Sequence, residues 1–137
     1  MMKPTVMNSL FPLLILALSS APLYSVSVSF FPKLRVYIGN ALPNNTHLLT
    51  VHCQSKDHDL GYHTLAVNEE IHWEFRQNIW ETTLYFCHFW WAGKDKSFAV
   101  FDRKLLKHLC GKICPWVVKE DGFYINKVGG LVKKNTW

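Results

Sequence analysis

Four cysteines that follow a single apolar segment constrain this chain more than any other feature of its sequence. They are Cys53, Cys87, Cys110 and Cys114. The apolar run 10–18 follows the positively charged Lys3 and precedes a group of small residues, which is the order found in a secretory signal. A secreted chain folds in an oxidising compartment, where an even number of cysteines generally forms disulfides. The sequence therefore predicts a small extracellular domain that is held by two disulfide bonds.

The N-terminal segment 1–27 is predicted to be a signal peptide that is removed, with the cleavage site left open between 21 and 29. A membrane anchor is the alternative. The apolar run is shorter than the roughly 20 residues that a spanning helix needs, and Pro12 interrupts it. We therefore expect a secreted mature chain of one domain, with no membrane insertion after cleavage.

The cysteine spacing leaves three disulfide pairings open. Cys110 and Cys114 are separated by three residues, so a bond between them would constrain little of the unfolded chain. We therefore expect each of them to pair with Cys53 or Cys87, in an order that the spacing does not decide. A zinc site is the alternative, because histidines neighbour several of the cysteines. Only one gap between cysteines fits a zinc knuckle, so we expect no metal and no cofactor.

Alternating apolar and polar residues, separated by turn residues, fill the remainder of the chain. Strands are predicted at 34–39, 47–53, 62–67, 71–77 and 82–91, near 98–100, and at 115–119 and 123–125. We expect 62–67 and 71–77 to form a hairpin, and 103–109 to be a short helical or irregular crossover. About eight short strands without a long amphipathic helix predict an all-β antiparallel sandwich or barrel. The domain is placed at 28–126, and the basic tail 127–137 is expected to be loosely held.

Charge and histidine content limit the function classes. The chain has 15 basic and 10 acidic side chains, and loss of Lys3 with the signal leaves about +4. Such a net charge is ordinary for a solvated surface. The sequence also lacks the strongly basic stripe that nucleic-acid binding requires. The seven histidines are scattered and form no recognisable pair of catalytic acid and base. We therefore expect no nucleic-acid partner and no catalytic residue.

Polar turns supply the candidate surface sites. Asn44 begins the N-glycosylation sequon Asn44-Asn45-Thr46, so we expect a glycan there. Rigid sandwiches present binding residues on loops, and two polar loops are the candidates for partner binding. Their residues are Lys56, Asp57, His58, Lys94, Asp95 and Lys96. Trp80 and Trp90 are expected to be the more exposed tryptophans, and the sequence assigns them no ligand.

Several ordered motifs together carry a family resemblance. They are Val36-x-Ile38-x-Asn40-x-Leu42, Val51-His52-Cys53-x-Ser55-Lys56-x-x-Asp59-Leu60-Gly61, Phe86-Cys87-x-Phe89-x-Trp91 and Cys110-x-x-x-Cys114-x-Trp116-x-Val118-x-x-Asp121-Gly122-x-Tyr124. With these motifs, the chain resembles the plant self-incompatibility S-protein family over residues 36–124. The resemblance implies a small β-sandwich with two disulfides and no enzymatic activity.

The resemblance also implies a function in recognition between cells. The founding poppy members are ligands that the stigma secretes and that a pollen membrane protein recognises. We therefore expect a secreted, monomeric, non-enzymatic ligand whose partner is a cell-surface receptor protein, with pollen–pistil rejection as one such role. The alternative is a secreted defence protein that acts directly on microbial walls or membranes through basic and aromatic residues.

Overall fold

The computed structural model describes residues 31–44 and 46–137, so the predicted signal 1–27 lies outside the described residues. The described strands are β1 (Lys33–Asn40), β2 (Leu49–Gln54), β3 (Asp59–Leu65), β4 (Glu70–Arg76), β5 (Tyr85–Trp91), β6 (Lys94–Phe101), β7 (Ile113–Lys119), β8 (Gly122–Lys127) and β9 (Gly130–Asn135). One short helix, α2 (Arg103–His108), lies between β6 and β7 and confirms the predicted crossover. The all-β prediction is confirmed, with one strand more than expected.

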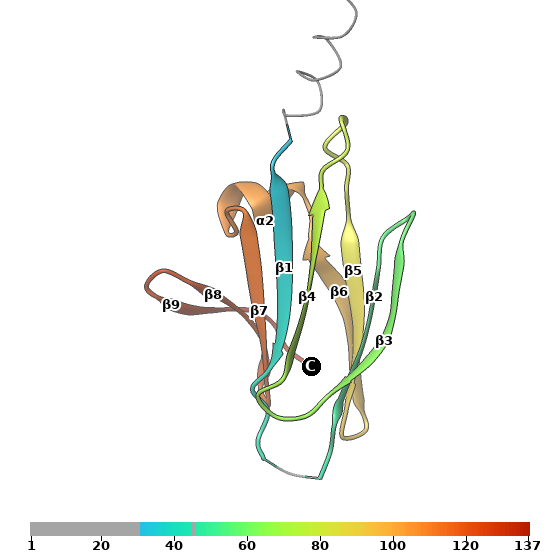
Figure 1. The fold of residues 1–137 in the computed structure, drawn as a ribbon. Coiled ribbons are helices and arrows are strands. Elements are labelled where there is room, and N and C mark those ends of the chain that lie inside the picture. The colour runs from blue at the N-terminus through green and yellow to red at the C-terminus, as the bar shows by residue number, and fades with distance from the viewer. Residues whose placement is uncertain (1–30, 45) are drawn as a thin grey trace, which may run out of the picture. The chain divides into compact units, whose positions relative to one another are not determined.

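The strands form two sheets, which pack face to face as a sandwich (Figure 1). The five-stranded sheet has the order β4-β1-β7-β8-β9, and the four-stranded sheet has the order β3-β2-β5-β6. Neighbouring strands in the described part run antiparallel, except that β1 and β7 are parallel. The helix α2 lies in the connection that carries the chain from β6 in one sheet to β7 in the other.

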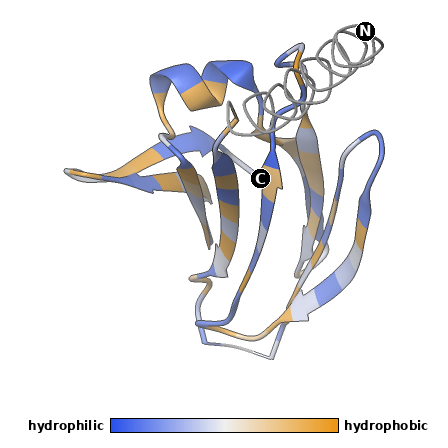
Figure 2. Cartoon of the chain, turned by 45° about the horizontal axis from the view of Figure 1, so that its top comes forward, coloured by the Kyte–Doolittle hydropathy of each residue, from blue (hydrophilic) through white to orange (hydrophobic). Residues whose placement is uncertain are grey.

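Strand alternation builds the core between the sheets. Figure 2 shows hydrophobic and hydrophilic residues alternating along many of the strands, as expected when one face of each sheet is buried. The fully buried side chains from the two sheets include Val36, Ile38, Leu49, Val51, Cys53, Cys87, Phe89, Val100, Val118, Phe123 and Ile125. A hydrogen bond also crosses the core, because the Trp116 indole N–H donates to the Val100 carbonyl at 2.8 Å. The sandwich is therefore joined by both packing and a buried polar contact.

The predicted hairpin of β3 and β4 is wrong. β3 pairs with β2 in one sheet, whereas β4 pairs with β1 in the other, so the connection 66–69 crosses between the sheets. Buried Asn40 fixes this crossing, because its Nδ2 donates to the Leu65 carbonyl at 3.0 Å. Alternation shows that a strand has a buried face, but it does not show which sheet the strand joins.

Both disulfides form, but the predicted pairing is wrong. Cys53 pairs with Cys87, and Cys110 pairs with Cys114. The strands β2 and β5 are neighbours, and their register sets Cys53 directly opposite Cys87. The prediction considered only how much unfolded chain a bond would constrain, whereas pairing follows from which cysteines the native fold brings together.

The C-terminal segment 127–137 is more firmly held than expected. Its strand β9 pairs with β8 along its length, with Ile125 opposite Val132. The Trp137 ring packs against Phe123 with centroids 4.6 Å apart, and its indole N–H donates to the Lys119 carbonyl at 2.9 Å. The basic composition suggested a solvated tail, but the last residue anchors it to the sandwich.

Candidate functional site

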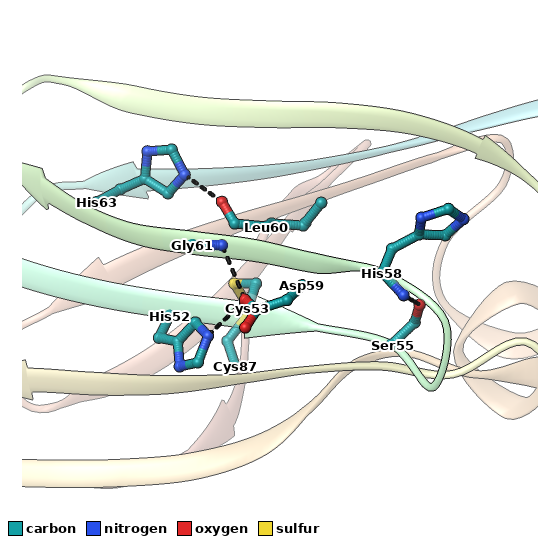
Figure 3. Close-up of polar contacts among 9 residues, drawn as sticks. All are labelled: His52, Cys53, Ser55, His58, Asp59, Leu60, Gly61, His63 and Cys87. Atoms are coloured by element: carbon teal, nitrogen blue, oxygen red, sulfur yellow. Dashed lines mark hydrogen bonds and ion pairs between the residues drawn. A yellow bond between two sulfur atoms is a disulfide. The ribbon is translucent and has the colours of Figure 1, made fainter.

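The first predicted binding loop is a short, closed turn between β2 and β3. The Ser55 amide donates to the His58 carbonyl at 2.8 Å. Figure 3 shows the second bond of the turn, in which the His58 amide donates to Ser55 Oγ at 3.2 Å. Lys56 and Asp57 lie between these residues and are exposed, as is His58. The loop therefore presents three polar side chains on a backbone that its own hydrogen bonds hold in place.

The second predicted loop is not a loop, because Lys94, Asp95 and Lys96 are the first residues of strand β6. The turn before them is the pair Ala92–Gly93, whose φ angles of 50° and 78° suit a tight two-residue hairpin. Alternation then separates the three side chains. Lys94 lies over the ring of Trp91, whereas the Asp95 carboxylate lies 3.2 Å from His88 Nε2.

The two predicted loops lie at opposite ends of the four-stranded sheet. Gln54, beside the first loop, pairs with Phe86 at the start of β5, whereas the Ala92–Gly93 turn follows the end of β5 (Figure 1). The length of β5 therefore separates them. They do not form one binding surface, and only the first loop has further candidate residues beside it.

Those further residues lie on the turn between β4 and β5, which Asn78 braces. Asn78 Oδ1 accepts from the Thr82 amide at 2.9 Å, and Asn78 Nδ2 donates to Thr82 Oγ1 at 3.0 Å. The Asn78 amide donates to Thr83 Oγ1 at 2.9 Å. These bonds hold a turn on which Ile79 and Trp80 are 69% and 75% exposed. Large apolar side chains held outward in this way are typical of a binding surface.

A hollow of about 940 Å³ lies between the β2–β3 loop, strand β4 and the braced turn. Its lining combines apolar side chains, namely Leu60, Trp73, Phe75, Trp80, Leu84 and Phe86, with the charged residues Lys56, Asp57, Asp59, Glu74 and Arg76. Among the described residues, the buried Nε1–H of Trp73 has no hydrogen-bond acceptor. We call the hollow, the residues 55–58 and the turn 78–81 together the loop-end surface.

Sequence reasoning found only part of the loop-end surface. It placed Lys56, Asp57 and His58 there and expected Trp80 to be exposed, but it did not connect Trp80 with the loop. The missed signal is Asn78 followed by Thr82 and Thr83, because an Asn side chain readily caps its own turn. The apolar pair Ile79–Trp80 lies inside this turn and is exposed.

Two of the histidines, His52 and His88, lie opposite each other on β2 and β5, and each contacts an aspartate. His52 Nε2 lies 2.7 Å from Asp59 Oδ1, which also accepts the Gly61 amide at 2.9 Å (Figure 3). The Gly61 amide first, and His52 second, hold the pKa of the Asp59 carboxyl below its ordinary value. In residues 31–44 and 46–137, no three His, Cys, Asp or Glu side chains converge as metal ligands.

The predicted glycosylation site lies away from this surface. Asn44 is exposed in the connection between β1 and β2, and Thr46 of the same sequon is exposed as well. Glycan attachment stays a prediction. In the described part of the chain, no helix is long and apolar enough to cross a bilayer.

A comparison with known protein families agrees with the cysteine pattern of the sequence and with the sandwich fold. The family described as "Plant self-incompatibility protein S1" matches residues 35–137, which include both disulfides and Trp137. The chain belongs to this family. The resemblance predicted from the sequence motifs is therefore confirmed, and it extends to the C-terminal strand that the motifs did not cover.

Named relatives of this S-protein family member come from Arabidopsis thaliana. S-protein homolog 5 is 42% identical over 74 residues, which cover 54% of this chain and 57% of the relative. S-protein homolog 6 is 38% identical over 106 residues, which cover 76% of this chain and 73% of the relative. The matches thus span little more than half of some relatives and about three quarters of others.

A solved structure shares the fold. It is described as a self-incompatibility protein homologue from a widespread family of small, highly stable, secreted plant proteins. The TM-score is 0.54 at 21% sequence identity, over 79% of this chain and 92% of that chain. At this identity the likeness concerns the fold alone.

Proposed function

We propose that this S-protein family member is a secreted recognition ligand that binds a cell-surface receptor protein through its loop-end surface. The observation that carries the proposal is the braced turn that displays Ile79 and Trp80. Tryptophan is enriched among the residues that dominate binding energy in protein interfaces. A side chain held in one place before binding also loses less conformational entropy on binding.

The surroundings of the turn support a protein partner. Lys56 and Asp57 place opposite charges on the rim of an apolar hollow, and a polar rim around an apolar centre is typical of protein interfaces. Family membership adds the expectation of an extracellular protein without enzymatic activity. The predicted signal 1–27 would deliver it there.

The test is binding of the purified, fluorescently labelled protein to intact plant cells of several tissues. We expect saturable binding in some tissues, competition by unlabelled protein, and loss of binding after the cells are treated with protease. The double variant Ile79→Ser/Trp80→Ala should bind at least about tenfold more weakly, because it removes the displayed apolar pair.

The matched control is Val128→Ser/Leu131→Ser, which removes two exposed apolar side chains from the β8–β9 hairpin. It should bind the cells as the unmodified protein does. Equal binding by both double variants would place the recognition surface elsewhere. Binding that is unsaturable, or that survives protease treatment, would contradict a receptor protein altogether.

A second candidate function is direct action on microbial membranes, and the β8–β9 hairpin favours it. The hairpin projects from the sandwich (Figure 1), and Val128 at its tip is fully exposed. Lys127, Lys133 and Lys134 are exposed along its strands. Apolar residues beside lysines suit an anionic lipid surface. In that case Val128→Ser/Leu131→Ser would abolish binding to anionic vesicles, whereas the Ile79/Trp80 variant would retain it.

A further inference from the structure

We infer that the outer face of the four-stranded sheet is a binding site for neutral oligosaccharides. The site consists of four rings, from His52, Tyr62, His88 and Trp90, and we call it the ring face. It is separate from the core, because alternation along β2 and β5 directs Cys53, Cys87 and Phe89 inward and their neighbours outward.

Strand register brings the four rings together. His52 on β2 pairs with Tyr62 on β3 and with His88 on β5, so these three residues form one row across the sheet. Trp90 lies two residues beyond His88 on the same strand and the same face. The sheet, rather than a flexible loop, therefore positions the rings.

The two histidines support the two larger aromatic rings. His52 stacks on Tyr62 with centroids 4.2 Å apart, and His88 stacks on Trp90 with centroids 3.8 Å apart and planes inclined by 7°. Tyr62 and Trp90 lie 5.9 Å apart. Because His52 covers one face of Tyr62 and Tyr62 is still 68% exposed, its opposite face is open to solvent. A sugar ring packs its C–H groups against such a face.

Two carboxylates flank the rings and fix the histidines. Asp59 Oδ1 lies 2.7 Å from His52 Nε2, as Figure 3 shows, and Asp95 Oδ1 lies 3.2 Å from His88 Nε2. Both aspartates are about 60% exposed, so their remaining oxygens face solvent. Carboxylate oxygens accept hydrogen bonds from sugar hydroxyl groups strongly, since charged acceptors form the stronger hydrogen bonds.

The composition of the ring face favours a neutral ligand. The outward residues of β2, β3, β5 and β6 around the rings are Thr50, Gln54, Thr64, Phe86, Asp95 and Ser97. None of them is Lys or Arg, so an anionic polysaccharide would meet two carboxylates whose basic neighbours, His52 and His88, are already engaged with them. Hydroxyl, amide and carboxylate groups around open aromatic rings instead match the alternating hydroxyl and C–H surfaces of a neutral sugar chain.

The test is isothermal titration calorimetry of the folded protein with cellohexaose, xylohexaose, mannohexaose and hexagalacturonic acid. We expect at least one neutral hexasaccharide to bind, with an affinity that is unchanged between about 0.05 and 0.5 M NaCl. Tyr62→Ala should weaken binding at least about tenfold, whereas Tyr62→Phe keeps the ring and should bind as before.

Trp80→Ala is the matched control, because it removes an exposed ring from the loop-end surface and should leave sugar binding unchanged. Failure of all three neutral hexasaccharides to bind at about 5 mM would overturn the inference. It would also be overturned by equal affinities of Tyr62→Ala and the unmodified protein, or by binding of hexagalacturonic acid alone. These results are independent of the receptor assay, so the two proposals can fail separately.

Discussion

Cys53 and Cys87 lie directly opposite each other on the two central strands of the four-stranded sheet, with Cα atoms 4.0 Å apart. Both side chains are completely buried. This bond links residues 34 apart in the sequence, whereas the bond between Cys110 and Cys114 links residues 4 apart. The two disulfides therefore constrain very different lengths of chain.

We predict that the two disulfides contribute unequally to stability. Replacing Cys53 and Cys87 by Ala should lower the free energy of unfolding by about 4 kcal/mol, because the closed loop is long. Replacing Cys110 and Cys114 by Ala should lower it by about 2 kcal/mol. Urea unfolding of the two double variants measures both values. A larger loss for the Cys110/Cys114 variant would show that loop length does not govern the effect here.

Asn40 is the buried polar residue that ties the two sheets together. Its Nδ2 donates to the Leu65 carbonyl, and its Oδ1 accepts from the Leu42 amide at 2.9 Å. Asn40→Ala should cost about 2–3 kcal/mol, because a buried carbonyl and a buried amide lose their partners. Urea unfolding again provides the measurement, with Asn126→Ala, the same change at an exposed position of β8, as the control. Equal stability of the two variants would contradict the role given to Asn40.

Trp137 should stabilise the sandwich even though it is the last residue of the chain. Trp137→Ala removes the hydrogen bond to Lys119 and the packing on Phe123, so we expect a loss of about 2 kcal/mol. Thermal unfolding of this variant is compared with that of Val128→Ala, which changes a fully exposed residue. An unchanged melting temperature for Trp137→Ala would restore the expectation of a loosely held tail.

The lowered pKa of Asp59 predicts a pH-dependent contribution to stability. The folded state favours the charged carboxylate, so the contribution is complete above the ordinary pKa of 3.8 and is lost as the pH falls through the lowered value. Asp59→Asn should therefore unfold at lower urea concentration than the unmodified protein at about pH 6, and the difference should shrink toward about pH 3.

Ser97→Ala, an uncharged change on the same sheet face, is the control for this pH series. The urea concentration at which Ser97→Ala unfolds should differ from that of the unmodified protein by the same amount at every pH. If the difference in unfolding urea concentration between Asp59→Asn and the unmodified protein were also constant with pH, the prediction would be wrong. The hydrogen bonds from Gly61 and His52 would then not depend on the charge of the carboxylate.

The local alternation of apolar and polar residues predicted the strands well. It did not predict which sheet each strand joins, because contacts between distant segments decide that. Leu49, Val51 and Cys53 alternate so clearly that β2 and its buried face followed from the sequence alone. The sheet to which β4 belongs did not follow, because Ile71, Trp73 and Phe75 would show the same alternation in either sheet. The hydrogen bond from Asn40 to the Leu65 carbonyl makes that choice, and it joins residues 25 apart.

The candidate site shows the same division between local and distant information. The polar loop at Lys56 could be predicted, since polar residues between two strands mark a turn. The grouping of His52, Tyr62 and His88 could not, because it depends on the register of three strands. Likewise, Lys94 and Asp95 resemble a charged loop in the sequence, and only the two-residue turn before them assigns their side chains to opposite faces.

The parallel pairing of β1 with β7 has a consequence for how the chain folds during synthesis. Residues 49–101 contain all four strands of one sheet, so that sheet and its disulfide need no residue beyond Phe101. The other sheet is completed later. Its strand β1 can pair with β4, but its second neighbour, β7, lies near the end of the domain, where Ile113 pairs with Arg35. Contacts of such sequence separation slow folding. Until β7 has emerged, one edge of β1 is left without its partner strand, and unpaired strand edges are prone to aggregation.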